Sequence, residues 1–133
     1  LAAVIVSELP IRVRLAAADW WRMLLDEHAS RVETPLAAAN WLIATYSSDV
    51  RAASAGAVPF LKLLGTVAGG WMMARAALAA QAQIASGNSD PFYAAKIVTA
   101  RFYADHVLSQ ADGLASSVTD GATGVLALTE EMF

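Results

Sequence analysis

The chain has 133 residues, of which 57% are hydrophobic and 16% charged, and its formal net charge is −3. This length predicts one domain, and the nine scattered basic residues argue against a nucleic-acid interface. The absence of cysteine excludes disulfides and thiolate metal sites and fits a reducing cytosol. No basic region precedes the N-terminal apolar run, so no signal peptide is predicted and we expect a cytoplasmic protein.

The charged share lies below the roughly 25% that is usual for globular domains. The chain therefore carries more apolar surface than a small monomer normally hides. We expect either a buried partner surface or a fragment of a longer protein. The first residue, Leu1, is not methionine and favours the fragment.

Two helices are predicted in the first third of the chain. Residues 1–9 lead in, and apolar positions recur at helical spacing over residues 10–29. The second helix is expected from Thr34 to Tyr46, after a capping-box pattern at residues 30–33. Its inward side is expected to hold small residues and one tryptophan: Ala37, Ala38, Trp41, Ala44 and Thr45. Beyond it, Asp49 is expected to cap at most a short turn that Gly56 closes.

The chain is organised around residues 58–86, which we expect to form the central helix. Pro59 suits the first helical turn, and Gly87 suits a left-handed position just beyond the last. Nearly every face of this segment is apolar or small, which is typical of a core helix or a membrane span. Each internal glycine costs roughly 1 kcal/mol against alanine. The glycines at 65, 69 and 70 therefore predict a neighbouring backbone in close contact.

The last long helix is predicted from Pro91 to about Val118, with Asp90 as its N-cap. Arg101 and Asp105 are four residues apart and are expected to pair. Gly113 is the expected weak point, and the tail after Asp120 is too short to assign. The expected buried stripe comprises Tyr93, Ile97, Ala100, Ala104, Val107, Ala111, Leu114 and Val118.

These elements predict an all-α fold, an antiparallel up-and-down four-helix bundle that forms a single domain over residues 1–133. No strand pattern competes with it. A membrane span over residues 63–81 is the alternative, since Arg75 is the only charge in that window. The alanine and glycine content and the cost of Arg75 favour a soluble core helix, so no membrane partner is expected.

The sequence offers no constellation of reactive groups. Leu25 and Tyr103 stand three residues before His28 and His106, where a di-metal bundle would need glutamate. His106 beside Asp105 is expected to be a surface pair. The serines lie at caps and loops, and Gly65 to Gly70 lie within a helix rather than a phosphate-binding loop. We therefore assign no catalytic, cofactor-binding or metal-ligating residue in the chain.

Aromatic residues are the remaining feature. The four tryptophans are expected to fill core or interface volume, with Trp20 and Trp21 pointing in different directions. Phe92-Tyr93 and Phe102-Tyr103 repeat ten residues apart. They suit either a core with satisfied hydroxyls or an interface stripe, and the sequence leaves both open.

Three stretches resemble a known domain. Phe60-Leu-Lys-Leu-Leu-Gly-Thr-Val-Ala-Gly-Gly-Trp71 is similar to the core motif of the extra C-terminal domain in a bacterial group of acyl-CoA dehydrogenases. The same is true of residues 92–104, which begin Phe-Tyr-Ala-Ala-Lys, and of the chain end at residues 127–133. That group includes enzymes similar to the 3-methylmercaptopropionyl-CoA dehydrogenases.

The resemblance implies a parent flavoenzyme that binds FAD and oxidises acyl-CoA thioesters at the α,β carbons. In that group the FAD pocket and the catalytic carboxylate belong to the preceding dehydrogenase module, and no position here matches those motifs. We therefore expect a noncatalytic domain that covers that module or joins subunits in a homo-oligomer. A self-contained helical scaffold or ligand-binding module is the alternative.

Overall fold

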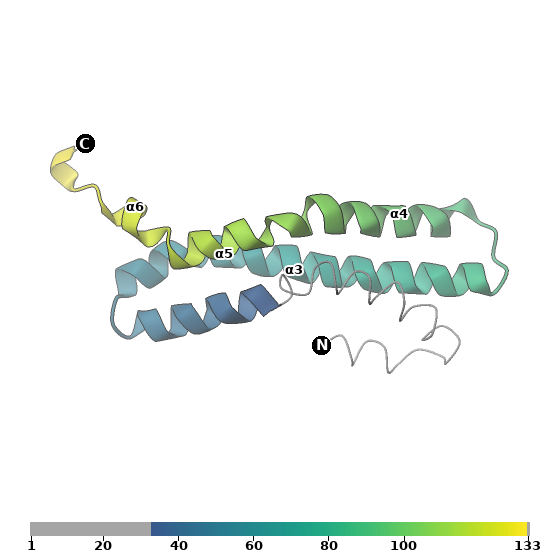
Figure 1. Cartoon of the computed structure of the whole chain (residues 1–133), viewed down its shortest axis with the longest axis horizontal. Helices are drawn as coiled ribbons and strands as arrows, with labels where there is room; N and C mark the ends of the chain where they lie inside the picture. Colours follow the sequence, from purple (N-terminus) through teal and green to yellow (C-terminus); the bar gives the residue numbers. More distant parts are fainter. Residues whose placement is uncertain (1–32, 133) are drawn as a thin grey trace. The chain divides into compact units, whose positions relative to one another are not determined.

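A computed structural model describes residues 33–132 of the chain. Within that range every regular element is helical and no strand occurs, so the predicted all-α class is confirmed (Figure 1). The helix predicted over residues 10–29, with Trp20, Trp21 and His28, lies outside the described residues. The described elements are a helix over residues 33–46, α3 (Val50–Ala85), α4 (Pro91–His106), the 3₁₀ turn η1 (Leu108–Gln110), α5 (Ala111–Thr119), α6 (Ala122–Leu126) and η2 (Glu130–Met132).

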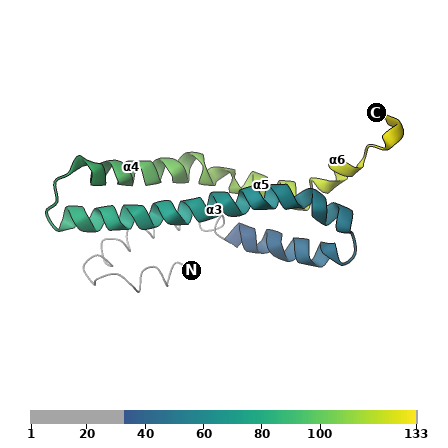
Figure 2. The ribbon, with the colours of Figure 1, turned by 180° about the vertical axis from the view of Figure 1, so that it is seen from behind.

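The described residues belong to two compact units. Unit 1 contains residues 68–108, and unit 2 contains residues 33–67 and 109–132. In unit 1, α4 runs beside the second part of α3, and in unit 2 the helix over residues 33–46 runs beside the first part (Figures 1 and 2).

Helix α3 begins at Val50, nine residues before the predicted start at Pro59. Asp49 caps it, since its Oδ1 accepts a hydrogen bond from the Ala52 backbone N–H at 2.9 Å. The expected stop at Gly56 and start at Pro59 are wrong, because both residues lie inside the helix. An internal proline costs about 3 kcal/mol, and the packing of α3 in unit 2 offsets that cost.

Gly56 marks one close contact in unit 2. A Cβ placed on it would lie 3.0 Å from the Val118 carbonyl oxygen and 3.1 Å from Cδ2 of Leu42. This residue therefore serves packing between elements rather than chain termination.

The core of unit 2 is built from four buried side chains, and Leu63 and Val118 are the largest. Ala38 and Ala111 complete the cluster. Six partly buried residues pack around it: Trp41, Leu42, Phe60, Val67, Leu114 and Ala115. Trp41 thus fills core volume, as expected. The helix over residues 33–46, however, turns Ala37 and Ala44 outward, because the larger side chain of Leu42 occupies the inward side in their place.

Unit 1 is built mainly from alanine. Its buried side chains are Ala74, Ala77, Leu78 and Ala80 on α3, Ala100 and Ala104 on α4, and Leu108. The connection between α3 and α4 is the one predicted. Gly87 has φ +90°, and the Asp90 carboxylate accepts a hydrogen bond from the Phe92 backbone N–H at 2.9 Å, with Pro91 starting the helix.

The glycines of α3 behave differently from one another. The segment is helical, as predicted, but a Cβ on Gly65 would meet nothing within 4 Å, so the expected close contact there is wrong. On Gly69 the same atom would overlap the Tyr103 side chain, and on Gly70 it would lie 3.4 Å from Cδ1 of Leu108. The contact at Gly69 is made by a side chain, not by a neighbouring backbone.

The last long helix is interrupted, contrary to the prediction. Helix α4 ends at His106, and η1 separates it from α5. The break does not fall at Gly113, which lies inside α5. Leu108 in η1 is buried, and a Cβ on Gly70 would lie 3.4 Å from its Cδ1, so a side chain at the break packs close to α3. Every residue of the predicted stripe is nevertheless buried or half-buried.

Candidate docking surfaces

The charged side chains of the described residues lie on helix exteriors and at helix ends. Arg101 and Asp105 form the predicted pair, with Nε donating to Oδ2 at 2.9 Å. The His106 ring also contacts the Phe102 ring, with the two centroids 4.5 Å apart. A hydrogen bond from Thr129, and then one from its own backbone, lower the pKa of the exposed Glu131 carboxyl. Residues 33–132 contain no group of three histidines or carboxylates that could hold a metal.

The cations of the described residues do not form a flavin site. A flavin dinucleotide needs donors that converge on its pyrophosphate, commonly at a helix N-terminus. In unit 1, Arg75 lies 4.9 Å above the Trp71 ring, and Arg101 is engaged by Asp105. In unit 2, Arg51 and Lys62 are exposed on the outside of α3. The cations of the described residues therefore do not converge on a site for a pyrophosphate, and no role toward FAD is assigned to this part of the chain.

Trp71 fills volume in unit 1, as expected for a tryptophan in this sequence. Its indole Nε1 is buried and has no hydrogen-bond partner in the structure. Such an atom costs free energy unless an acceptor reaches it. Its ring instead supports the Arg75 guanidinium.

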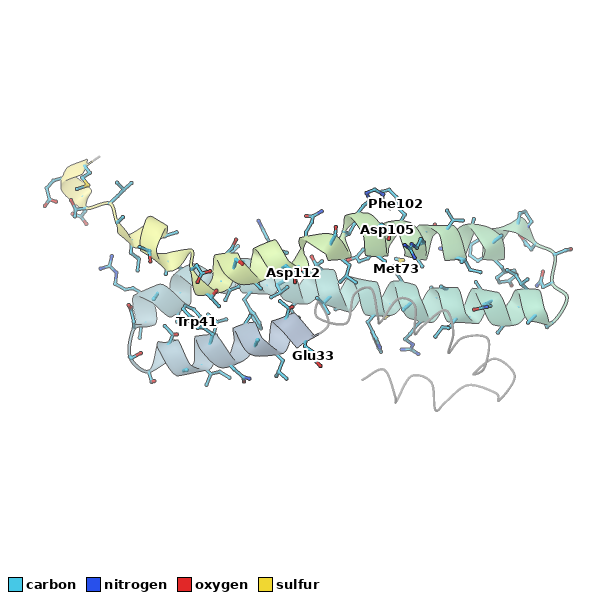
Figure 3. All side chains as sticks on the ribbon, viewed as in Figure 1. Glu33, Trp41, Met73, Phe102, Asp105 and Asp112 are labelled. Atoms are coloured by element: carbon cyan, nitrogen blue, oxygen red, sulfur yellow. The ribbon has the colours of Figure 1, made fainter. Side chains whose placement is uncertain are left out.

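The outward face of α4 carries both phenylalanines of the repeated Phe-Tyr pairs. Phe92, Val98 and Phe102 are exposed, whereas Tyr93 and Tyr103 are half-buried. Phe102 is labelled in Figure 3. Lys96 Nζ lies 5.1 Å from the centre of the Phe92 ring. The sequence left open whether these pairs lie in the core or on the surface, and each Phe-Tyr pair has one residue in each place. The tyrosines belong to the packing of unit 1, and the phenylalanines belong to its surface.

A second apolar surface lies on α3 in unit 2. We call it the α3 outer face, and it comprises Val50, Ser54, Ala57, Val58, Leu61 and Leu64, all of them exposed. At 100° per residue these positions fall within an arc of about 120°. Leu61 is 69% exposed, although it lies two residues from the fully buried Leu63. The polar member, Ser54, satisfies its own hydroxyl by donating to the Val50 carbonyl at 2.7 Å.

This face revises the expectation that α3 is buried on all sides. By length and composition α3 could cross a membrane. Only 11% of its most apolar window is buried within the structure, so the expectation of a mostly buried core helix is wrong for this window. One such helix is weak evidence for a membrane span. The sequence missed the outer face because buried and exposed positions are equally apolar.

Comparison with known families places the chain. Residues 11–129 match the family model described as acetyl-CoA dehydrogenase C-terminal like. The chain belongs to this family. The resemblance inferred from the glycine-tryptophan and Phe-Tyr motifs is therefore confirmed, and the chain is a C-terminal acyl-CoA dehydrogenase domain.

A curated relative of this domain is a 3-methylmercaptopropionyl-CoA dehydrogenase from Ruegeria pomeroyi. The two sequences are 42% identical over 85 residues, which is 64% of this chain and 14% of the relative. The matched region thus spans about one seventh of the relative's length. No solved structure matches the domain.

Proposed function

We propose that this C-terminal domain is a noncatalytic accessory and interface element of an FAD-dependent acyl-CoA dehydrogenase. The parent enzyme would oxidise acyl-CoA thioesters at the α,β carbons, with FAD bound by its preceding dehydrogenase module. The family match over residues 11–129 carries this proposal. The relative supports it, because it is named as an acyl-CoA dehydrogenase and is several times longer than the matched region.

The described surfaces support a contribution through packing. Exposed apolar side chains gather on the outer faces of α3 and α4. Apolar patches that contact water often mark surfaces that bind another protein. Residues 1–133 would fold as one antiparallel up-and-down four-helix bundle. Its partners would be the dehydrogenase module of the same polypeptide, a second copy in a homo-oligomer, or both, in the cytoplasm.

The test uses the polypeptide translated from the complete reading frame that encodes this chain. We expect it to purify with FAD, and we expect an acyl-CoA substrate to bleach the flavin absorbance without added metal. A polypeptide that holds no flavin, or a flavin that no acyl-CoA reduces, would contradict the proposal.

Single substitutions in the domain then test whether its side chains take part in acyl-CoA oxidation. Replacing exposed carboxylates of the domain, such as Asp105 or Asp112, should leave acyl-CoA oxidation unchanged. If either replacement abolished turnover while flavin content and folding stayed normal, the domain would be catalytic.

A further inference from the structure

We propose that the α3 outer face docks on the dehydrogenase module of the same polypeptide, against an apolar strip whose edge carries carboxylates. This inference rests on the proposed function and adds to it the surface and the chemistry of the partner. The residues that support the inference all lie in unit 2.

The face has the composition of an interface core. Val50, Val58, Leu61 and Leu64 are exposed together on one side of a single helix. The opposite side of the same segment is already occupied, because Phe60, Leu63 and Val67 pack in the core of unit 2. The face is therefore a second apolar surface on a helix whose first is satisfied, and such surfaces mark protein contacts.

Charge indicates what the partner carries. Arg51 and Lys62 both follow one edge of the face, about 20° apart around the helix axis. Neither makes an ion pair or a side-chain hydrogen bond with another described residue, and α3 contains no acidic residue. An edge with two cations and no compensating anion fits a partner surface that presents carboxylates.

The same charges argue against a second copy of the chain on this face. In a symmetric pair the two copies would present identical faces, and α3 contains no acidic side chain that could pair with the cations of the other copy. They also argue against a lipid surface, since interfacial helices of that kind usually carry many basic residues along the polar side. Here the side opposite the face is packed in a protein core instead.

The length of the relative beyond the matched region also supports docking on a module of the same polypeptide. The relative extends far beyond the region that this chain matches, which covers 14% of it. A tethered module is present at high effective concentration, so even a modest apolar face would remain occupied.

Carbene footprinting of the complete polypeptide tests the inference, because carbenes label any exposed side chain. Val125 on α6 is the internal reference, since it is 67% exposed and Leu61 is 69% exposed. We expect severalfold weaker labelling of Leu61 and Leu64 than of Val125. Leu61→Asp should raise the labelling of Leu64 severalfold toward that of Val125, although Leu64 is 47% exposed and Val125 is 67% exposed. Val125→Asp should leave Leu64 protected, with Leu128, which is 55% exposed, as the reference in that variant. Lys62→Glu should raise the labelling of Leu64 partway.

A photo-crosslinker at position 61 identifies the occupant. The inference requires crosslinks to peptides of the same polypeptide that lie outside residues 1–133 and contain aspartate or glutamate. Crosslinks to this chain in a second copy, found by mixing isotope-labelled protein, would overturn it. Protection that appears only with anionic vesicles would overturn it as well.

The outcome is separable from the proposed function. If Leu61 labels as strongly as Val125 in a flavoprotein that oxidises acyl-CoA, the docking inference fails and the function stands. If the polypeptide holds no flavin, the function fails, whatever the labelling shows.

Discussion

In unit 2 the side chains of Leu63 and Val118 form one buried cluster with Ala38 and Ala111, whereas in the described part of unit 1 the Tyr103 side chain lies across Gly69. Large side chains in a core gain transfer free energy in proportion to their buried area. Small residues gain less from each side chain but let helices and rings approach closely. The region around Leu63 should therefore be sensitive to lost volume, and the region around Gly69 to added volume.

The largest expected effect is a loss of volume in unit 2. Leu63→Ala should lower the free energy of unfolding by about 2–5 kcal/mol, because it removes a side chain with no exposed surface. Leu61→Ala is the matched control on the same helix, and its effect on the isolated chain should stay within about 0.5 kcal/mol. Urea unfolding of both variants makes the comparison. Equal changes in the free energy of unfolding would contradict the difference in burial between Leu63 and Leu61.

Added volume in unit 1 comes next. Gly69→Leu should destabilise the chain by about 1–3 kcal/mol or more, because the Tyr103 side chain occupies the space that its Cβ needs. Gly65→Ala is the control and should stabilise by about 0.5–1 kcal/mol, since a Cβ there meets nothing and alanine favours the helix. Tyr103→Phe should recover part of the loss in Gly69→Ala. A thermal melt of Gly69→Leu unchanged within error would contradict the contact.

The smallest expected effect is the loss of stability when a helix N-cap is removed, and its size should be the same in both units. Asp90 and Asp49 each accept a backbone hydrogen bond at 2.9 Å, one at the start of α4 and one at the start of α3. Replacing either with alanine should cost about 1 kcal/mol. Circular dichroism melts would check both. A much larger loss for one aspartate would mean that the units differ in more than side-chain packing.

Local signals predicted the ends of elements well where a backbone requirement is strict. The stop at Gly87 and the start at Asp90-Pro91 were correct, because a positive φ and a cap with proline leave few alternatives. Pro59 misled the prediction, since tertiary packing around Leu63 and Phe60 carries α3 through it. The break before α5 also lies beside a distant contact, that of Leu108 with Gly70.

The candidate surfaces were harder to predict for a physical reason. Periodicity separates buried from exposed positions only when the exposed ones are polar. On α3 both sides are apolar, so the excess of hydrophobic residues indicated a partner surface without locating it. Phe92 and Phe102 could not be assigned either, because aromatic residues suit cores and interfaces alike.

We propose that this domain acts by packing and that FAD binds another part of its polypeptide. A titration of residues 1–133 with FAD, followed by flavin fluorescence and calorimetry, tests this claim most directly. We predict no saturable binding, and no shift of the thermal melt in excess flavin. Stoichiometric binding of FAD to the chain alone would contradict the account.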